Sequence, residues 1–200
     1  MPPTPAWTFG PLTAADLPRL SEWLSRPHIA RWWPSEGTLE GTTREFAAIL
    51  KAGSATRGFL ALWDAEPAAF VQCYPVMGAG EGWWESETDP GARGIDLFIA
   101  AEGLLGQGHG THLIASFVAE LFRDVSVTRI QADPAPDNLR AIRACRRAGF
   151  SDRGTVITPD APRFSSCVSA PESPPDLSAP AGPSNLLTVR QAAPRETGRA

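Results

Sequence analysis

The stretch that decides the fold reads Arg93-Gly-Ile-Asp96-Leu-Phe-Ile-Ala100 and, four residues later, Leu105-Gly-Gln-Gly108-His-Gly110-Thr-His112. The first half is a β-branched and aromatic run typical of a strand, and the second half has glycine at alternate positions. Residues 113–122 follow with apolar side chains at helical spacing. A strand, a glycine turn and a helix direct backbone N–H groups at a phosphate. The stretch therefore indicates a phosphate-binding turn, with a plain glycine loop as the alternative.

Two familiar phosphate motifs do not fit this turn. A Walker loop requires Gly-Lys-Ser/Thr, whereas Gly110 is followed by Thr111 and His112. The dinucleotide fingerprint requires G-x-G-x-x-G, and the glycines here alternate strictly with other residues. The sequence therefore argues against a nucleotide-hydrolysing site and against a dinucleotide site.

Bulk composition limits the protein class. A chain of 200 residues with 42% hydrophobic residues predicts one globular domain with a sizeable core. A formal charge of −4 argues against nucleic acid as a partner. We find no apolar run long enough for a membrane span and no export leader, which predicts a cytoplasmic protein with no membrane partner. The odd, widely spaced cysteines suit a reducing compartment, and with the histidines they form no metal pattern: Cys73, Cys145, Cys167, His28, His109 and His112.

The hydrophobic pattern predicts alternating helices and strands, and thus an α/β (α+β) fold. Expected strands are residues 6–12, 57–63, 68–76, 93–100, 126–132 and 150–157, and expected helices are residues 13–24, 43–52, 113–122 and 138–148. Thr13 and Asp16 form a capping-box variant, Pro27 ends the first helix, and Asp137 caps the last one before Gly149 closes it. The expected domain is residues 1–162. Residues 163–200 are rich in Pro, Ala and Ser and are predicted to be disordered, with residues 163–168 as the one candidate for a last strand.

Two tryptophan-rich segments need an explanation. Trp33, beside Trp32, is either part of the core or an aromatic wall for a substrate. The loop before Asp96 combines Trp83 and Trp84 with several carboxylates, and Asp133 ends a neighbouring strand. Acids beside exposed aromatic rings are what a cationic ligand requires, although a solvated charged loop is the default interpretation. The loop carboxylates are Glu81, Glu85, Glu87 and Asp89.

Two motifs resemble those of the GCN5-related N-acetyltransferases, or GNATs. Residues 105–110 are similar to the acyl-CoA pyrophosphate loop, Gln/Arg-x-x-Gly-x-Gly/Ala, with Leu105 at the Gln/Arg position. Asn138-x-x-Ala141-x-x-x-Cys145-x-x-x-Gly149-Phe150 is similar to Asn-x-x-Ala-x-x-x-Tyr-x-x-x-Gly-Phe, with Cys145 in place of tyrosine. The resemblance implies the GNAT fold, a mixed and mostly antiparallel sheet splayed between the fourth and fifth strands and flanked by about four helices. It also implies acetyl-CoA as cosubstrate, without a metal, held by Phe98, Ile99, Ala100, Leu105, Gly106, Gln107, Gly108, His109, Gly110 and Asn138.

Longer matches narrow the resemblance. Residues 22–33, 82–96, 128–143 and 154–160 look like the aminoglycoside 6′-N-acetyltransferases, and the similarity runs from about residue 7 to 162. It implies a monomer that transfers acetyl to the 6′-amine of a polycationic aminoglycoside and so gives antibiotic resistance. The implied substrate-binding residues are Trp33, Glu81, Trp83, Trp84, Asp96, Asp133 and Asp160.

The reaction needs a base because an ammonium group cannot attack a thioester until it loses a proton. By resemblance Asp96 is that base, and Asp133 holds another ammonium. Family members protonate the departing thiolate with the motif's tyrosine. Cys145 occupies that place with an ordinary pKa of about 8.5, but its side chain is shorter by roughly two atoms.

Two alternatives stay open. One is N-acylation of a hydroxylysine-type siderophore precursor, whose enzymes share related His and Trp-Trp patterns, although an acid-lined loop suits its carboxylate less well. The other is a binding protein with weak turnover, which the departures at Leu105 and Cys145 suggest.

Overall fold

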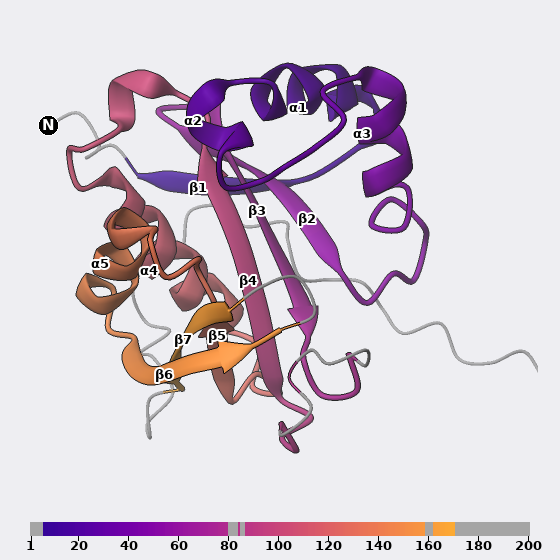
Figure 1. Ribbon diagram of the computed structural model, residues 1–200. Coiled ribbons are helices and arrows are strands. Elements are labelled where there is room, and N and C mark those ends of the chain that lie inside the picture. The colour runs from indigo at the N-terminus through magenta and orange to yellow at the C-terminus, as the bar shows by residue number, and fades with distance from the viewer. Residues whose placement is uncertain (1–5, 80–83, 85–86, 159–161, 171–200) are drawn as a thin grey trace, which may run out of the picture.

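The computed structural model describes residues 6–79, 84, 87–158 and 162–170. Seven strands form one sheet in the order β1-β2-β3-β4-β5-β7-β6, and helices cover both of its faces (Figure 1). No helix among these residues is long and apolar enough to cross a membrane.

The first four strands form an antiparallel meander: β1 Trp7–Pro11, β2 Arg57–Trp63, β3 Glu66–Pro75 and β4 Ala92–Ile99. The β2–β3 hairpin closes through Asp64 and Ala65, both with positive φ (52° and 66°), which matches the right-handed twist of the paired strands. The predicted strand 57–63 is confirmed to the residue.

Alternate residues along the strands point to opposite faces of the sheet and pack into two separate cores. Helices α1 Leu17–Leu24, α2 Pro27–Ala30 and α3 Leu39–Phe46 cover the core that contains Leu60 and Phe70. Helices α4 His109–Leu121 and α5 Leu139–Arg147 cover the other, built around Ile95, Phe117 and Ile130. Two 3-10 turns, η1 Ala14–Asp16 and η2 Glu102–Leu104, precede α1 and α4.

The sheet splays beside β4. Strand β5, Arg129–Ala132, runs parallel to β4 but pairs with it only from Ala92↔Arg129 to Gly94↔Gln131. Strand β4 continues to Ile99, so its segment 95–99 has a neighbour on the β3 side and none on the β5 side among the described residues. This is the predicted splayed, mixed sheet.

The C-terminal boundary predicted at residue 162 is wrong. Strand β7, Pro162–Ser169, lies inside the sheet between β5 and β6 (Ser151–Ile157) and pairs antiparallel with both. Ser165, Ser166 and Cys167 are buried there. Backbone pairing on two edges orders a segment whose composition alone resembles a disordered tail. Residues 171–200 lie outside the described part.

Three helix boundaries also differ from expectation. The predicted helix 43–52 is α3, which begins earlier because the Thr38 hydroxyl accepts a hydrogen bond from the Gly41 N–H at 3.0 Å. Pro27 begins α2 as well as following α1. Asn138, not Asp137, caps α5, through its Oδ1 and the Ala141 N–H (3.2 Å).

Candidate functional site

Asp96 on β4 is the centre of a polar group that we call the acid cup: Gln72, Tyr74, Trp84, Asp96 and Asp133. Gln72 faces Asp96 in the β3–β4 register, and its amide donates to the Asp96 carboxylate at 2.8 Å. The next facing pair that shares this side of the sheet is Tyr74 and Gly94. The cup therefore lies where β5 begins to separate from β4.

Tyr74 is the site residue that sequence reasoning missed. Its ring packs on Gly94 so closely that a Cβ at Gly94 would lie 2.4 Å from the ring. Burial, then the charges of Asp96 and Asp133, raise the pKa of Tyr74 well above its usual value, and the nearby Trp84 indole opposes the shift. The phenol therefore keeps its proton under the charge of two nearby carboxylates. It is the one tyrosine of the chain, but no motif marked it.

Burial raises the pKa of Asp96 above that of an exposed aspartate. The Gln72 hydrogen bond, the charge of Arg163 on β7 and the Tyr74 hydrogen bond all oppose that rise. A carboxylate whose proton affinity is increased while its charge is stabilised by donors can accept a proton from a bound amine.

Two of the loop acids, Glu87 and Asp89, have structural partners instead. The Glu87 carboxylate pairs with Arg129 at 3.2 Å and accepts from Gln131, both on β5. Asp89 accepts from the Thr128 hydroxyl at 2.6 Å and the Gly91 N–H at 2.8 Å, and these bonds lower its pKa. Glu87 therefore attaches the loop to β5, and Asp89 attaches it to Thr128, the residue directly before β5.

The tryptophans predicted to bind the substrate also differ in their surroundings. The Trp33 indole packs on Phe46, Phe70 and Phe98, and its Nε1 donates to Glu45 at 2.8 Å, which supports the core interpretation. Trp84 is partly buried beside Tyr74. Glu81, Trp83 and Asp160 lie outside the described residues.

The glycine turn is open and lies directly before α4. Gly106 and Gly108 have positive φ (78° and 89°), and a Cβ at either would meet nothing within 4 Å. Gly108 is the N-cap of the thirteen-residue helix α4, so the helix N-terminus faces this open space. The Trp63 ring lies against two histidine rings, with its centroid 4.5 Å from that of His109 and 5.9 Å from that of His112.

Several other residues predicted to contact the cofactor have side chains that contact other parts of the protein. Leu105 packs against the core that α4 covers, and Gln107 donates to the Gly103 carbonyl. The Asn138 side chain is used as the cap of α5. The strand residues Phe98, Ile99 and Ala100 form the end of the open β4 segment and lead towards the turn.

Cys145 lies on the inner face of α5 and is 5% exposed. Burial raises its pKa to about 11, against a hydrogen bond with Ser166. The thiol therefore stays protonated inside the core, with little access to a ligand.

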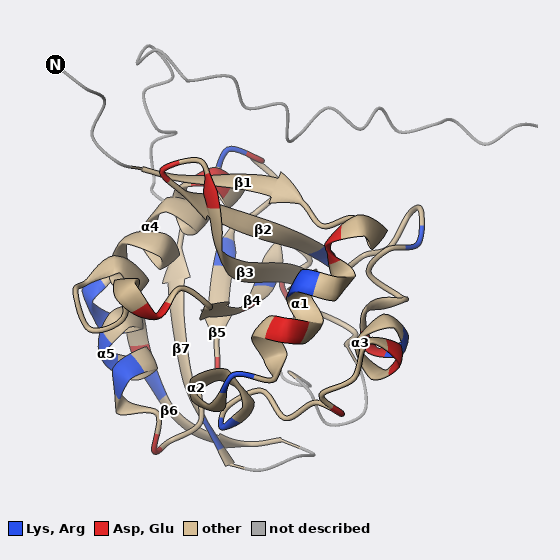
Figure 2. Ribbon diagram, turned by 90° about the horizontal axis from the view of Figure 1, so that it is seen from above, with Lys and Arg blue, Asp and Glu red and all other residues tan. Residues whose placement is uncertain are grey.

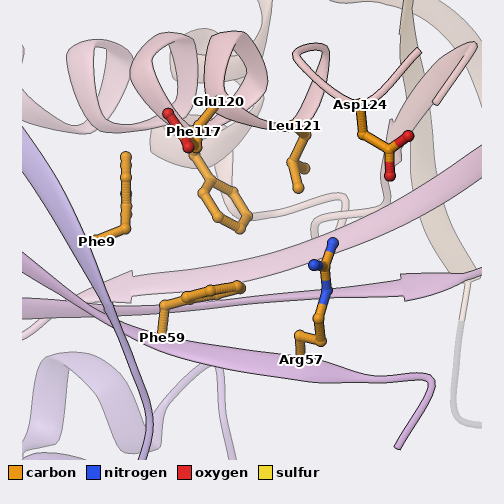
Figure 3. A pocket seen from close by; sticks show the side chains of 7 residues that line it. All are labelled: Phe9, Arg57, Phe59, Phe117, Glu120, Leu121 and Asp124. Carbon is orange, nitrogen blue, oxygen red and sulfur yellow. The ribbon is translucent and has the colours of Figure 1, made fainter. Parts of the chain in front are cut away.

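A small cavity under the C-terminal half of α4 is unrelated to the cup. Phe9, Phe59 and Phe117 line it, with Arg57, Glu120, Leu121 and Asp124 around its rim (Figure 3). Its volume of about 10 Å³ is enough for roughly one water molecule. Among the residues that the structure describes, no group of three His, Cys, Asp or Glu side chains could hold a metal ion.

Known proteins are similar to this chain over most of its length. The family described as "Acetyltransferase (GNAT) domain" matches residues 13–158. An aminoglycoside N(6′)-acetyltransferase type 1 from Klebsiella pneumoniae is 46% identical over 154 residues, 76% of this chain and 77% of the relative. A crystal structure of the aminoglycoside acetyltransferase AAC(6′)-Ib with coenzyme A and kanamycin matches with a TM-score of 0.77 at 43% identity, covering 82% of this chain and 95% of that chain.

A more distant relative is the lysine N-acyltransferase MbtK from Mycobacterium tuberculosis, 25% identical over 147 residues, 69% of this chain and 64% of the relative. The fold, the glycine turn and these matches agree. The chain belongs to the GNAT acetyltransferases, and within them it stands with the aminoglycoside N(6′)-acetyltransferases.

Proposed function

We propose that the chain transfers acetyl from acetyl-CoA to the 6′-amino group of an aminoglycoside, with Asp96 as general base, and thereby gives resistance. The observation that carries this proposal is the position of Asp96. Its carboxylate lies on β4 at the start of the splay, held by Gln72 and Tyr74, with increased proton affinity. Relatives with this activity, solved with coenzyme A and kanamycin, share the fold.

The residues fit an acyl-CoA. The open edge of β4 offers backbone groups without a β5 partner, and the glycine turn offers N–H groups beside open space at the N-terminus of α4. Figure 2 shows basic residues gathered on α5, which packs beside α4. When bound, acetyl-CoA supplies the activated acetyl group. The glycine turn would hold its pyrophosphate, and residues 98–100 would hold its extended arm.

The acid cup would bind and deprotonate the amine. Asp96 accepts a proton from the substrate ammonium, directly or through one water, and frees the nitrogen lone pair for attack. Asp133 would hold a second ammonium, and the indole of Trp84 would cover one side of the sugar. Glu81, Trp83 and Asp160 are proposed contacts that come from the sequence resemblance alone.

Cys145 occupies the position at which the family motif has the tyrosine that protonates the departing thiolate. Its burial and its raised pKa argue against rapid proton delivery to the departing thiolate. We therefore propose that solvent supplies that proton and that turnover is slower than in relatives with a tyrosine there.

One observation favours a second candidate, acylation of a lysine-type substrate that carries a carboxylate. Arg163 places a positive charge near Asp96, where a carboxylate could pair with it. The positive charge of Arg163 offsets only one of the two negative charges near Tyr74, so the acid cup still favours a cation.

A thiol-release assay tests the proposal. Acetyl-CoA is offered with kanamycin, tobramycin or a hydroxylysine derivative, and mass spectrometry with fragmentation locates the new acetyl group. We expect 6′-acetylated drug and no acylated amino acid. Turnover of the hydroxylysine derivative alone would move the function to the second candidate, and acetylation at another amine would contradict the proposed regiochemistry.

A further inference from the structure

Two side chains at the start of α2 bind backbone carbonyls at the end of the open β4 segment. The Arg26 guanidinium donates to the Ala100 carbonyl at 2.6 Å, and His28 Nε2 lies 3.1 Å from the Ile99 carbonyl. These carbonyls are consecutive, and the side chains that meet them come from residues more than 70 positions away. We call Arg26 and His28 the β4 clamp.

Neighbouring carboxylates hold the two clamp side chains in place. Arg26 also pairs with Glu22 one helical turn earlier, at 2.7 Å, and Pro27 begins α2 directly after it. His28 Nδ1 lies 3.7 Å from the Glu102 carboxylate in η2. Both clamp side chains are less than one-third exposed, so their bonds compete little with water.

The two carbonyls lie where the features proposed to hold acetyl-CoA join. Ile99 is the last residue of the β4 segment 95–99, which has no β5 partner among the described residues. Downstream, Ala101 and η2 lead to the glycine turn. On the other side of the chain, the N–H groups of Ala100 and Ala101 both donate to the Ala68 carbonyl. The backbone is therefore held from β3 and from the α1–α2 junction at the point where the strand ends.

We infer that Arg26 and His28 are positioning residues for the acetyl donor, which fix the relative placement of the open β4 edge and the glycine turn. The inference rests on the proposed use of acetyl-CoA. A ligand that contacts two backbone segments at once loses affinity when the link between them becomes mobile, because binding must then order that link. The clamp should affect the acetyl donor and leave the amine site, which lies at the other end of the segment, largely unchanged.

The test measures the KM of acetyl-CoA, the KM of the drug and Tm for His28→Phe and Arg26→Met. Each removes donors and keeps a side chain of similar bulk. We expect the KM of acetyl-CoA to rise about five- to tenfold, the size of one lost hydrogen bond, while the KM of the drug stays within about twofold. His28→Gln, which restores an N–H donor, should recover most of the affinity.

Arg44→Met is the matched control. Arg44 on α3 forms an arginine–glutamate ion pair of similar length, with its guanidinium 2.6 Å from Glu36. It should leave both KM values unchanged. Equal rises in both KM values with a fall in Tm would overturn the inference, since that pattern marks a merely structural role, and so would an unchanged acetyl-CoA KM in both clamp variants.

Calorimetric titration of acetyl-CoA without drug separates this inference from the proposed function. Weakened binding in the clamp variants supports the clamp even if no aminoglycoside is acetylated. Wild-type binding in Arg26→Met and in His28→Phe contradicts it even if the drug is the substrate.

Discussion

Glu87 and Asp89 form one pair of acids near strands β4 and β5, Asp96 and Asp133 form another, and the two pairs have opposite surroundings. The first pair accepts hydrogen bonds from β5 side chains and from nearby backbone N–H groups, and the pKa of Asp89 is lowered. The second pair flanks a phenol, and burial raises the pKa of Asp96. The partners of a carboxylate, rather than its presence in an acidic stretch, decide whether it serves structure or chemistry.

Asp96→Asn should have the largest effect because it removes the acceptor for the amine proton. We expect kcat/KM to fall by about a hundredfold or more, with acetyl-CoA affinity unchanged. Tm at neutral pH should rise, because a group whose pKa is raised by folding destabilises the native state when ionised. The gain should shrink as pH falls through the folded pKa. Near wild-type turnover would remove Asp96 from the mechanism.

Gly94→Ala should come next, because it disturbs the Tyr74 phenol near the two acids that we propose to be functional. The new Cβ would lie 2.4–2.8 Å from three Tyr74 atoms, so the ring must move. We expect a loss of about tenfold in kcat/KM and about 1–3 kcal/mol of stability from overpacking. Gly10→Ala is the control, since its nearest neighbour would be 3.9 Å away. Equal effects in both variants would mean that Tyr74 has no part in the site.

Glu87→Gln should affect stability but not chemistry. It replaces the carboxylate that Arg129 and Gln131 contact with an amide and leaves the partly exposed Arg129 guanidinium without its counter-charge. We expect a loss of about 1–3 kcal/mol in chemical denaturation, with the KM of the drug within about twofold. A large rise in that KM with unchanged stability would show that Glu87 faces the substrate and would erase the contrast between the two pairs.

Arg163→Gln should have the smallest effect and tests how the functional acid is tuned. The arginine lowers the pKa of Asp96 against the effect of burial, so its removal should raise that pKa further. Because the base must be ionised, the acid limb of the kcat/KM profile should move to higher pH. A limb that stays in place, or moves to lower pH, would show that Arg163 does not act on Asp96.

Much of the fold followed from local patterns. The β2–β3 hairpin, the glycine turn before α4 and Gly149 after α5 lie where residue types and spacing predicted them. Strand β7 lies at the one candidate for a last strand, residues 163–168, but its composition predicted disorder, because its polar and small residues carry no strong period and its order comes from two neighbouring strands. Asn138 took the capping role from Asp137 for a similar reason: adjacent residues of equal propensity differ only in geometry.

The sequence by itself determined the family and singled out Asp96, the residue that we propose as the base. The two motifs are local, and Asp96 lies in an apolar strand beside the turn, so neither depends on distant parts of the chain. Only the tertiary structure decided that Glu87 pairs with β5, that Tyr74 lies near the charges of Asp96 and Asp133, that Cys145 is buried, and that Arg26 and His28 meet the end of β4. Each of these depends on burial and on hydrogen-bond partners far away in the chain, and periodicity and spacing along the sequence carry no record of them.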